Sequence, residues 1–255
     1  MKLSVITVTY NNQTGIGEYL TSVFKNLPKD SEVIVLDNAS TDKTLEELRK
    51  EKRVKLIESK ENLGYAKGNN LAVKEAEGEY LFFLNPDTVV LDGAIEKLLS
   101  FAEGLEGWGI ISPKLIEGNG RVQLSVRKLP TLWRAIKEYY LGRKGEYGEY
   151  APESAAPVVV ESVVGAAILI KDRVFKRAGR FNERYFMYFE DLDLCRKVRR
   201  LGLDVIYLPE SEIVHRVGGS IHELKGRWII NSARVYHGSI KAWLLYIILR
   251  LRPRQ

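Results

Sequence analysis

The sequence lacks several features that would assign it to a specialised class of protein. Cys195 is its only cysteine, which excludes an intramolecular disulfide and favours a reducing compartment. No apolar run is long enough to span a membrane, and the first residues lead into a strand without the apolar core of a signal peptide. Internal repeats and low-complexity tracts are also missing. We therefore expect a globular protein of the cytoplasm.

Motifs for nucleotide cofactors and nucleic acids are incomplete or absent as well. Residues 14–20 contain Gly-x-Gly where a dinucleotide fingerprint would lie, but Leu20 replaces its third glycine, and residues 10–12 make the loop long and polar. This disfavours a Rossmann dehydrogenase, and the lack of Gly-Lys-Ser/Thr excludes a P-loop. The net charge is +6, yet no helix-turn-helix, zinc-finger or RNA-binding signature accompanies it, so we expect no nucleic-acid partner.

The first hundred residues alternate between short apolar runs and segments of helical periodicity. The chain has 255 residues, 45% of them hydrophobic and 28% charged, which suits one large or two small globular domains. Strands are predicted at 3–9, 32–36, 54–57 and 80–84, and helices at 16–27, 41–48, 71–76 and 92–102. This alternation predicts an α/β fold with a doubly wound, mostly parallel sheet.

The second half of the chain changes character. Residues 143–156 are polar and offer little to bury, so we predict a mobile loop there. Gly202 is expected to end a helix. Strands are predicted at 108–115, 121–126, 158–170, 204–208 and 212–215, and helices at 132–141, 190–201 and from about 222 to the end.

Asp87 follows the apolar run 80–84 at the point where Pro86 should stop a buried strand. Open α/β sheets bind ligands at the carboxyl ends of their strands, so a carboxylate here can hold a divalent metal that takes phosphate oxygens. The alternative is an aspartate that caps a turn. Two other predicted strands end in polar loops, at residues 10–11 and 37–38, and the three loops should meet at one sheet edge.

Asp37 also has two interpretations. It follows a strand and precedes a polar cluster in which Ser40 or Thr41 is predicted to cap the next helix. Asp37 either belongs to that cluster or accepts from the N–H of a base or the hydroxyl of a ribose.

Glu190 and Asp191 lie at a predicted helix start, where exposed N–H groups favour acids. They also follow the aromatic run 185–189, and burial beside aromatic rings raises a carboxylate pKa and suits a general base. His215, at the end of a short strand, is either structural or a contact for metal or diphosphate. His222 and His237 are assigned no role.

Together these residues resemble family 2 glycosyltransferases of the GT-A fold, most closely the rhamnosyltransferase-like members. The likeness runs from Leu3 to about Ser220. Within it, His215 lies where members often carry a late histidine. Its departure is Asn85, which replaces the first acid of the Asp-x-Asp metal motif and leaves Asp87 as the main carboxylate. The matching segments are residues 4–11, 35–42, 62–70, 85–87, 165–166 and 190–194.

The resemblance implies the roles of these positions. Asp191 would be the general base and Glu190 would orient it or the acceptor. Asp87 and His215 would hold Mg²⁺ or Mn²⁺ against the diphosphate. The acceptor side would include Gly165, Ala166 and Tyr188. The nucleotide-sugar-binding residues would be Thr9, Tyr10, Asn11, Asp37, Asn38, Asn62, Lys67, Gly68, Asn69, Asn85 and Asp87.

The implied reaction is an inverting transfer from a UDP- or dTDP-linked sugar, dTDP-rhamnose among the candidates, to a hydroxyl of a saccharide or lipid-linked saccharide. The catalytic domain would cover residues 1–220, with a nucleotide-sugar-binding half at 1–104 and an acceptor half at 105–220, followed by a helical segment at 221–255. A sugar-nucleotide pyrophosphorylase shares a similar sheet, but its N-terminal glycine-rich basic loop is missing. A non-catalytic sugar-binding relic is the third alternative, against which Asp87, Asp191 and His215 argue.

The C-terminal segment is apolar and basic. Residues 242–249 are apolar, and no acid occurs from residue 241 onward. A short apolar helix with cationic ends suits the headgroup boundary of an anionic membrane, which would place the protein on the inner face of the cell membrane. The alternative is a helix packed on the catalytic domain or on a second subunit of a homodimer. The flanking cations are Lys241, Arg250, Arg252 and Arg254.

Overall fold

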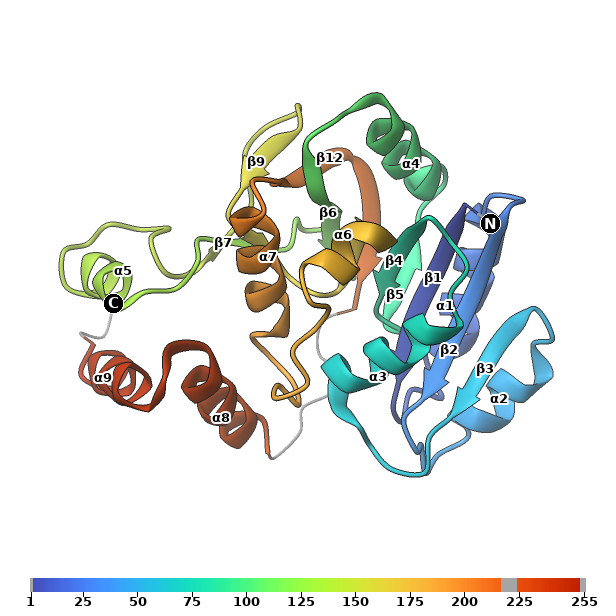
Figure 1. Ribbon diagram of the computed structural model, residues 1–255, viewed down its shortest axis with the longest axis horizontal. Coiled ribbons are helices and arrows are strands. Elements are labelled where there is room, and N and C mark those ends of the chain that lie inside the picture. The colour runs from blue at the N-terminus through green and yellow to red at the C-terminus, as the bar shows by residue number, and fades with distance from the viewer. Residues whose placement is uncertain (1, 217–223, 253–255) are drawn as a thin grey trace.

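The parallel half of the sheet lies at the N-terminal end of the chain. The computed structural model describes residues 2–216 and 224–252. Strands β1 (Leu3–Thr9), β2 (Ser31–Asp37), β3 (Val54–Glu58) and β4 (Tyr80–Leu84) pair in parallel in the order β3-β2-β1-β4 (Figure 1). All four lie within one residue of their predicted bounds. Their runs are rich in Val, Ile and Leu because both faces of a parallel sheet are covered.

Helices cover both faces, which confirms the doubly wound arrangement. One core packs α1 (Ile16–Asn26) and α4 (Ala94–Gly104) against the sheet through Tyr19, Leu98 and their neighbours. The other packs α3 (Gly64–Ala72), α6 (Asp172–Arg177) and α7 (Glu190–Arg200) against the opposite face. Helix α2 (Thr44–Lys50) joins β2 to β3. Gly202, with a φ of 78°, follows the end of α7 as predicted.

The second half of the sheet is mixed, so "mostly parallel" holds only for its first four strands. Strand β11 (Ala167–Lys171) runs antiparallel to β4 and to β6 (Trp108–Glu117), while β6 and β12 (Asp204–His215) are parallel. The short strands β5 (Thr88–Val90) and β9 (Val158–Val160) add antiparallel pairs with β12. Insertion of β11 beside β4 brings the acceptor-side sequence next to the end of β4.

The prediction of a single strand at residues 158–170 was wrong. The chain forms β9, β10 (Ser162–Val163) and β11 instead. Glu161 turns its carboxylate to Arg134, with Nη1 to Oε2 at 2.6 Å, and Gly165 uses its backbone for other partners. A β-rich composition cannot show such breaks, because the groups that cause them lie far away in the sequence.

Four other boundaries differ from prediction. The loop and helix predicted at 62–76 are helix α3 followed by the 3-10 turn η1 (Val73–Glu75). The strand predicted at 121–126 is reduced to β7 (Val126–Arg127) and an isolated bridge at Val122. The strands predicted at 204–208 and 212–215 are one strand, β12, with a register shift between Leu208 and Glu212. The helix predicted to be capped by Ser40 or Thr41 begins at Thr44, whose N–H donates to Asp42.

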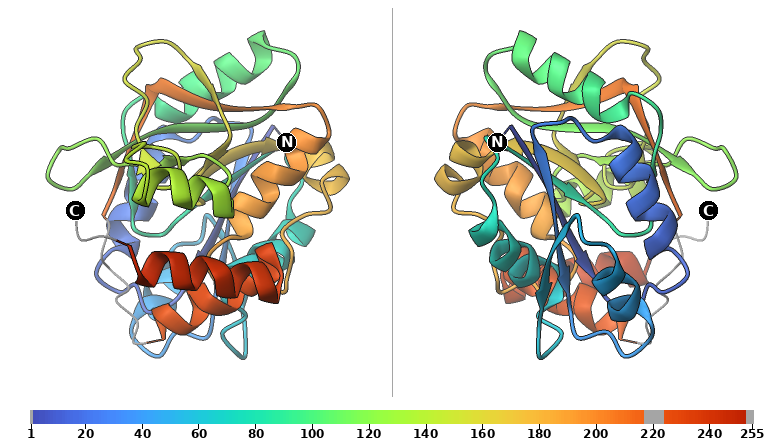
Figure 2. Two further views of the ribbon diagram at one scale, coloured as in Figure 1. Left: turned by 90° about the vertical axis from the view of Figure 1, so that its left-hand side faces the viewer. Right: turned by 90° about the vertical axis from the view of Figure 1, so that its right-hand side faces the viewer.

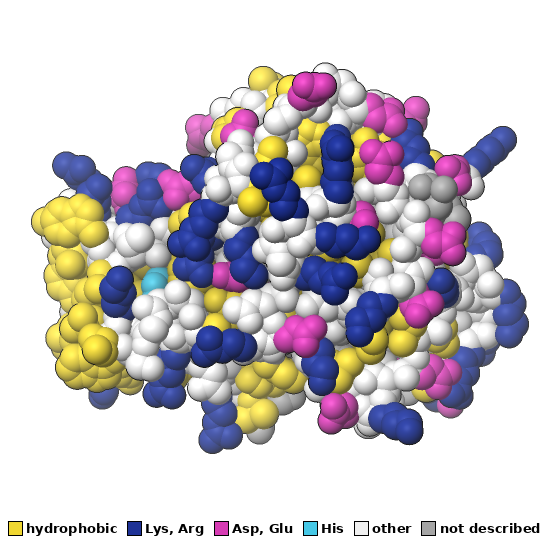
Figure 3. Space-filling model, viewed as in Figure 1, with side chains coloured by type: hydrophobic (Ala, Val, Ile, Leu, Met, Phe, Trp, Pro, Cys, Tyr) yellow, Lys and Arg dark blue, Asp and Glu magenta, His cyan; other side chains and the backbone are white. Residues whose placement is uncertain are grey.

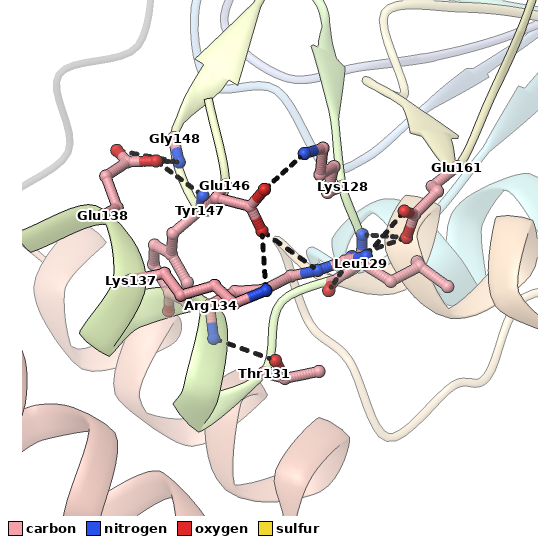
Figure 4. A network of polar contacts seen from close by, with 10 residues as sticks. All are labelled: Lys128, Leu129, Thr131, Arg134, Lys137, Glu138, Glu146, Tyr147, Gly148 and Glu161. Atoms are coloured by element: carbon pink, nitrogen blue, oxygen red, sulfur yellow. Dashed lines mark hydrogen bonds and ion pairs between the residues drawn. The ribbon is translucent and has the colours of Figure 1, made fainter. Parts of the chain in front are cut away.

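The predicted mobile loop at 143–156 makes several polar contacts with α5 (Leu132–Tyr139) and its surroundings. Its residues 149–150 form β8, which joins β10 and β7 in a three-stranded sheet. The Glu146 carboxylate lies 2.8 Å from Lys128 Nζ and near Arg134, and the N–H groups of Tyr147 and Gly148 donate to Glu138 (Figure 4). A polar segment can thus be held by ion pairs even though it offers little to bury.

The C-terminal part forms two helices, α8 (Lys225–His237) and α9 (Ser239–Arg250). Helix α9 packs on α8 and α5, burying Ala242 and Leu245, and Tyr140 Oη donates to the Ile248 carbonyl at 3.0 Å (Figure 1). Within residues 2–216 and 224–252, no helix is long and apolar enough to cross a membrane. The predicted boundary at 220/221, the glycines near it, His222 and Arg254 lie outside the described residues.

Candidate active site

The three predicted strand-end loops meet around one cavity. Strands β1, β2 and β4 are adjacent and parallel, so their carboxyl ends lie side by side. The cavity has a volume of about 150 Å³. Its lining includes seven of the residues predicted to bind a nucleotide sugar: Thr9, Tyr10, Asn11, Asn38, Asn62, Asn85 and Asp87.

Hydrogen bonds between the loops fix the shape of this cavity. Asn11, which has a φ of 52°, donates its N–H to Ser40 Oγ at 3.0 Å and accepts the Thr41 N–H on Oδ1 at 2.8 Å. Asn12 Nδ2 donates to the Pro86 carbonyl at 2.8 Å, joining the end of β1 to the end of β4. Ser40 and Thr41 therefore tie two loops together instead of capping a helix.

The two carboxylate oxygens of Asp37 have different surroundings. One carboxylate oxygen, Oδ2, accepts the Ser40 N–H at 3.0 Å and so stabilises the turn. The other, Oδ1, is buried without a hydrogen-bond partner, as is Oγ1 of Thr9 on the register-matched position of β1. Two neighbouring buried oxygens without partners are costly unless a ligand supplies them. Asp37 is buried and is not among the residues that line the cavity, whereas the adjacent Asn38 is.

Within the Asn62–Asn70 segment, Asn62, Gly64 and Tyr65 line the cavity. Asn38 and Asn62 orient each other through Nδ2 and Oδ1 at 2.9 Å. Lys67, Gly68 and Asn69 do not line the cavity. A Cβ on Gly68 would lie 3.0 Å from the Val8 side chain, and Asn69 Nδ2 donates to the Tyr65 carbonyl, so both positions serve the packing and geometry of α3.

Asp87 and His215 meet as predicted. Antiparallel pairing of β5 with β12 brings His215 Nε2 to 3.3 Å from Asp87 Oδ1, and His215 Nδ1 lies 2.8 Å from Gln123 Oε1. In the tautomer whose Nδ1–H donates to Gln123, Nε2 presents a lone pair toward a carboxylate oxygen that is buried without a hydrogen bond. Two facing acceptors suit a cation between them.

The donor set fits a divalent metal that is shared with a ligand. In the part of the chain that the structure describes, no cluster of three His, Cys, Asp or Glu residues could hold a metal alone. Mg²⁺ in phosphate sites characteristically takes one or two protein ligands, and water and phosphate oxygens supply the rest. One carboxylate and one imidazole therefore suit a metal that binds together with a diphosphate.

Glu190 and Asp191 begin α7 and are not among the residues that line the cavity, which Phe186 and Met187 of the preceding segment do line. Tyr188 and Phe189, with φ of 72° and 69°, make the left-handed turn that leads into the helix. Asp191 Oδ2 accepts the Gly165 N–H at 3.0 Å, and Oδ1 accepts the Leu192 N–H at 2.7 Å. Ala166, next to Gly165, accepts the Asn85 N–H at 2.9 Å, which connects the acceptor-side pair to the end of β4.

The two carboxyl groups have raised pKa values. Burial raises the pKa of Glu190 well above 4.5, and the neighbouring Asp191 charge raises it further. Glu190 Oε2 is buried without a partner. Burial also raises the pKa of Asp191, while the N–H groups of Leu192 and Gly165 oppose that shift. Asp191 is thus the better stabilised anion of the pair, as a base requires.

Several residues that shape the site were not predicted. Tyr65 lines the cavity, donates its N–H to the Phe186 carbonyl at 2.8 Å and donates its hydroxyl to the Gly165 carbonyl at 2.7 Å. Trp228 of α8 also lines the cavity and lies 5.0 Å from the Phe186 ring. Tyr65 lies inside a recognised motif and could have been found there. No local pattern marks Trp228 or Gln123.

Comparison with known proteins agrees with this geometry. Residues 4–148 match the model of glycosyl transferase family 2. The N-acetylglucosaminyl-diphospho-decaprenol L-rhamnosyltransferase of Mycobacterium tuberculosis is 29% identical over 84% of this chain and 75% of its own length. Rhamnosyltransferase WbbL of Escherichia coli K12 is 28% identical over 60% of each chain.

Solved structures show the same fold at lower identity. GalNAc-T7 with UDP, GalNAc and Mn²⁺ superposes with a TM-score of 0.70 at 16% identity, covering 93% of this chain and 48% of that one. S. aureus TarS 1-349 with UDP gives 0.64 at 20% identity, covering 100% and 67%. These likenesses establish the GT-A glycosyltransferase architecture. With the family match over more than half of its length, the chain belongs to glycosyl transferase family 2, among its rhamnosyltransferase-like members.

Proposed function

We propose that the protein is an inverting, metal-dependent glycosyltransferase that uses a UDP- or dTDP-linked sugar, with dTDP-rhamnose as the first candidate. The observation that carries this is a chain of hydrogen bonds that links the candidate base to the metal side. Asp191 Oδ2 accepts the Gly165 N–H, and the adjacent Ala166 carbonyl accepts the N–H of Asn85, two residues before Asp87. A donor diphosphate held at Asp87 and an acceptor hydroxyl held at Asp191 would then meet near the end of β4, as a single displacement with inversion requires.

In this mechanism the chain positions both reactants. Asn38 and Asn62 hold the nucleoside end of the donor, together with Thr9 and Asp37, whose buried Oγ1 and Oδ1 have no hydrogen-bond partner. Asp191 accepts the proton of the acceptor hydroxyl, whose oxygen bonds to the anomeric carbon as the bond from that carbon to the diphosphate breaks. A bound Mg²⁺ or Mn²⁺, held by Asp87 and His215, would neutralise charge on the leaving nucleoside diphosphate.

Glu190 supports this chemistry as a neutral neighbour. Its raised pKa favours the protonated form of the buried carboxyl, and that form can donate a hydrogen bond to Asp191 or to the acceptor. The acceptor is proposed to be a saccharide or lipid-linked saccharide, approaching past Gly165, Ala166 and Tyr188. The exposed side chains of α9 would then rest on an anionic membrane surface at the inner face of the cell membrane.

The test is Asp191→Asn, compared with Asp172→Asn, which removes an acid from the first turn of α6 instead. Sugar transfer by the first variant should fall by roughly 10²–10⁴-fold, the usual worth of a positioned base. Donor binding measured by calorimetry should stay unchanged in both. Near-normal transfer by folded Asp191→Asn would remove Asp191 from this role. If the protein instead releases pyrophosphate when it is supplied with a sugar 1-phosphate and a nucleoside triphosphate, it is a pyrophosphorylase.

A further inference from the structure

A second cavity, larger than the first, opens between α5, α7 and the α8–α9 pair. Its volume is about 670 Å³. Figure 2 shows α5 lying beside the two C-terminal helices, and α7 forms the inner wall. We call it the basic cleft. Its lining consists of Leu129, Pro130, Thr131, Leu132, Trp133, Arg196, Arg199, Arg200, Tyr236, His237 and Lys241.

The cleft is strongly positive. Four of its lining residues are cations and none is an acid. Arg196 is paired with the buried Asp193, whereas Arg200 and Lys241 have no ion-pair or hydrogen-bond partner within residues 2–216 and 224–252. The carboxyl end of α7 adds only about half a negative charge, which the remaining cations outweigh.

The pKa of His237 is affected by the same positive charges. Its pKa is lowered to about 4, first by burial and then by the positive charges of Arg196 and Lys241. Its Nε2 is buried without a hydrogen-bond partner. The ring is therefore neutral near pH 7 and leaves the cleft an uncharged group that can donate to or accept from a ligand.

An apolar surface borders the basic cleft. Trp133 on α5 and Trp243 on α9 are 58% and 62% exposed, and Ile240 is 77% exposed. In Figure 3 hydrophobic side chains gather along the left-hand edge of the molecule, where Figure 1 places α5 and α9. A ligand that fits both features has an anionic head and an apolar body.

We propose that the basic cleft binds the phosphate or diphosphate group of a lipid phosphate, whose apolar chain lies along the exposed side chains of α5 and α9. This inference rests on the proposed function, because such a lipid would carry the acceptor saccharide. Asp191 begins the same helix that ends at Arg199 and Arg200, and eight residues of helix rise about 12 Å. A sugar attached to a phosphate in the cleft can extend along α7 toward the base.

The test measures binding of geranyl diphosphate to the full chain in excess EDTA, without donor, using tryptophan fluorescence. The double variant Arg200→Gln/Lys241→Gln should bind roughly tenfold or more weakly, because charge-assisted contacts are lost. Lys29→Gln/Lys74→Gln, which removes two exposed lysines elsewhere, is the matched control and should bind like the wild type. Geraniol should bind far more weakly than the diphosphate. Equal affinity of both variants would overturn the proposal.

A second arm separates a lipid phosphate from general membrane charge. Vesicles of a neutral bulk lipid that carry a small share of a lipid diphosphate are compared with vesicles of the same bulk lipid brought to the same surface charge with phosphatidylglycerol. Stronger binding to the former, lost in Arg200→Gln/Lys241→Gln, supports the proposal, and equal binding to both vesicles refutes it. The readout needs no transfer reaction. A wild type that binds geranyl diphosphate but transfers no sugar therefore contradicts only the proposed function. A wild type that transfers sugar, but whose affinity for geranyl diphosphate is unchanged by Arg200→Gln/Lys241→Gln, contradicts only this inference.

Discussion

Replacing Glu190 with glutamine should stabilise the protein increasingly as the pH rises. The Glu190 carboxyl is buried, its Oε2 has no partner, and its pKa lies well above 4.5. Between the unfolded pKa near 4.5 and the folded value, the native state therefore keeps a proton that the unfolded state has lost. The free energy of unfolding falls with pH wherever the native state holds more protons. Glutamine has no titratable proton, so the variant lacks this loss of stability with rising pH.

The magnitude follows from the linkage. The free energy of unfolding of Glu190→Gln, minus that of the wild type, should grow by up to about 1.4 kcal/mol per pH unit from pH 4.5 until the folded pKa is reached. Any cost of burying the amide is independent of pH, so the slope is diagnostic. Urea unfolding at half-unit intervals from pH 5 to pH 8 measures it.

Glu61→Gln is the matched control, because Glu61 is exposed and its nearest cation, Lys67 Nζ, lies 4.0 Å away. Its unfolding curve should run parallel to that of the wild type. If the Glu190→Gln curve also runs parallel, Glu190 is ionised in the folded state and cannot be the neutral donor proposed above. Transfer activity should fall in this variant even as stability rises, as is common where a site is strained for function.

The other predictions concern the metal, the nucleoside and the membrane. Asp87→Ala should abolish transfer and weaken UDP or dTDP binding mainly when Mn²⁺ is present, and full wild-type activity in excess EDTA would exclude the metal. Asp37→Ala should weaken binding of the free nucleoside diphosphate by roughly tenfold, as expected for a lost hydrogen bond to a charged group, and unchanged calorimetric affinity would confine Asp37 to its turn. Ile240→Ser/Trp243→Ser, which alters only exposed side chains of α9, should reduce salt-sensitive sedimentation with anionic vesicles at unchanged melting temperature. A wild type that ignores such vesicles at low salt would leave α9 a structural helix.

Sequence reasoning found the parts of the site that depend on strand ends. Alternation of apolar runs predicted β1 to β4, and parallel strands must end at one edge, so the meeting of Asn11, Asn38 and Asp87 followed. The sequence-based prediction failed where contacts between residues far apart in the sequence determine the local structure. The predicted strand at 158–170 is broken where Glu161 and Gly165 contact Arg134 and Asp191. Asn70, in the helix at 64–72, exchanges two hydrogen bonds with the Phe181 backbone. Local sequence propensity cannot predict contacts with residues about 30 to 110 positions away.

Tyr65 limits how this protein can acquire new substrates. Its N–H and hydroxyl are both committed, to Phe186 and Gly165, and a Cβ on Gly64 would meet the Phe186 carbonyl oxygen at 2.3 Å. Substitutions here would disturb the nucleotide side and the base together, so an engineer cannot retune one without the other. The segment from Lys128 to Tyr150 is held away from Tyr65 by its own ion pairs and by the contacts of Glu138 to the Tyr147 and Gly148 N–H groups. Directed evolution for a different acceptor should therefore accumulate its changes there and leave Tyr65 untouched.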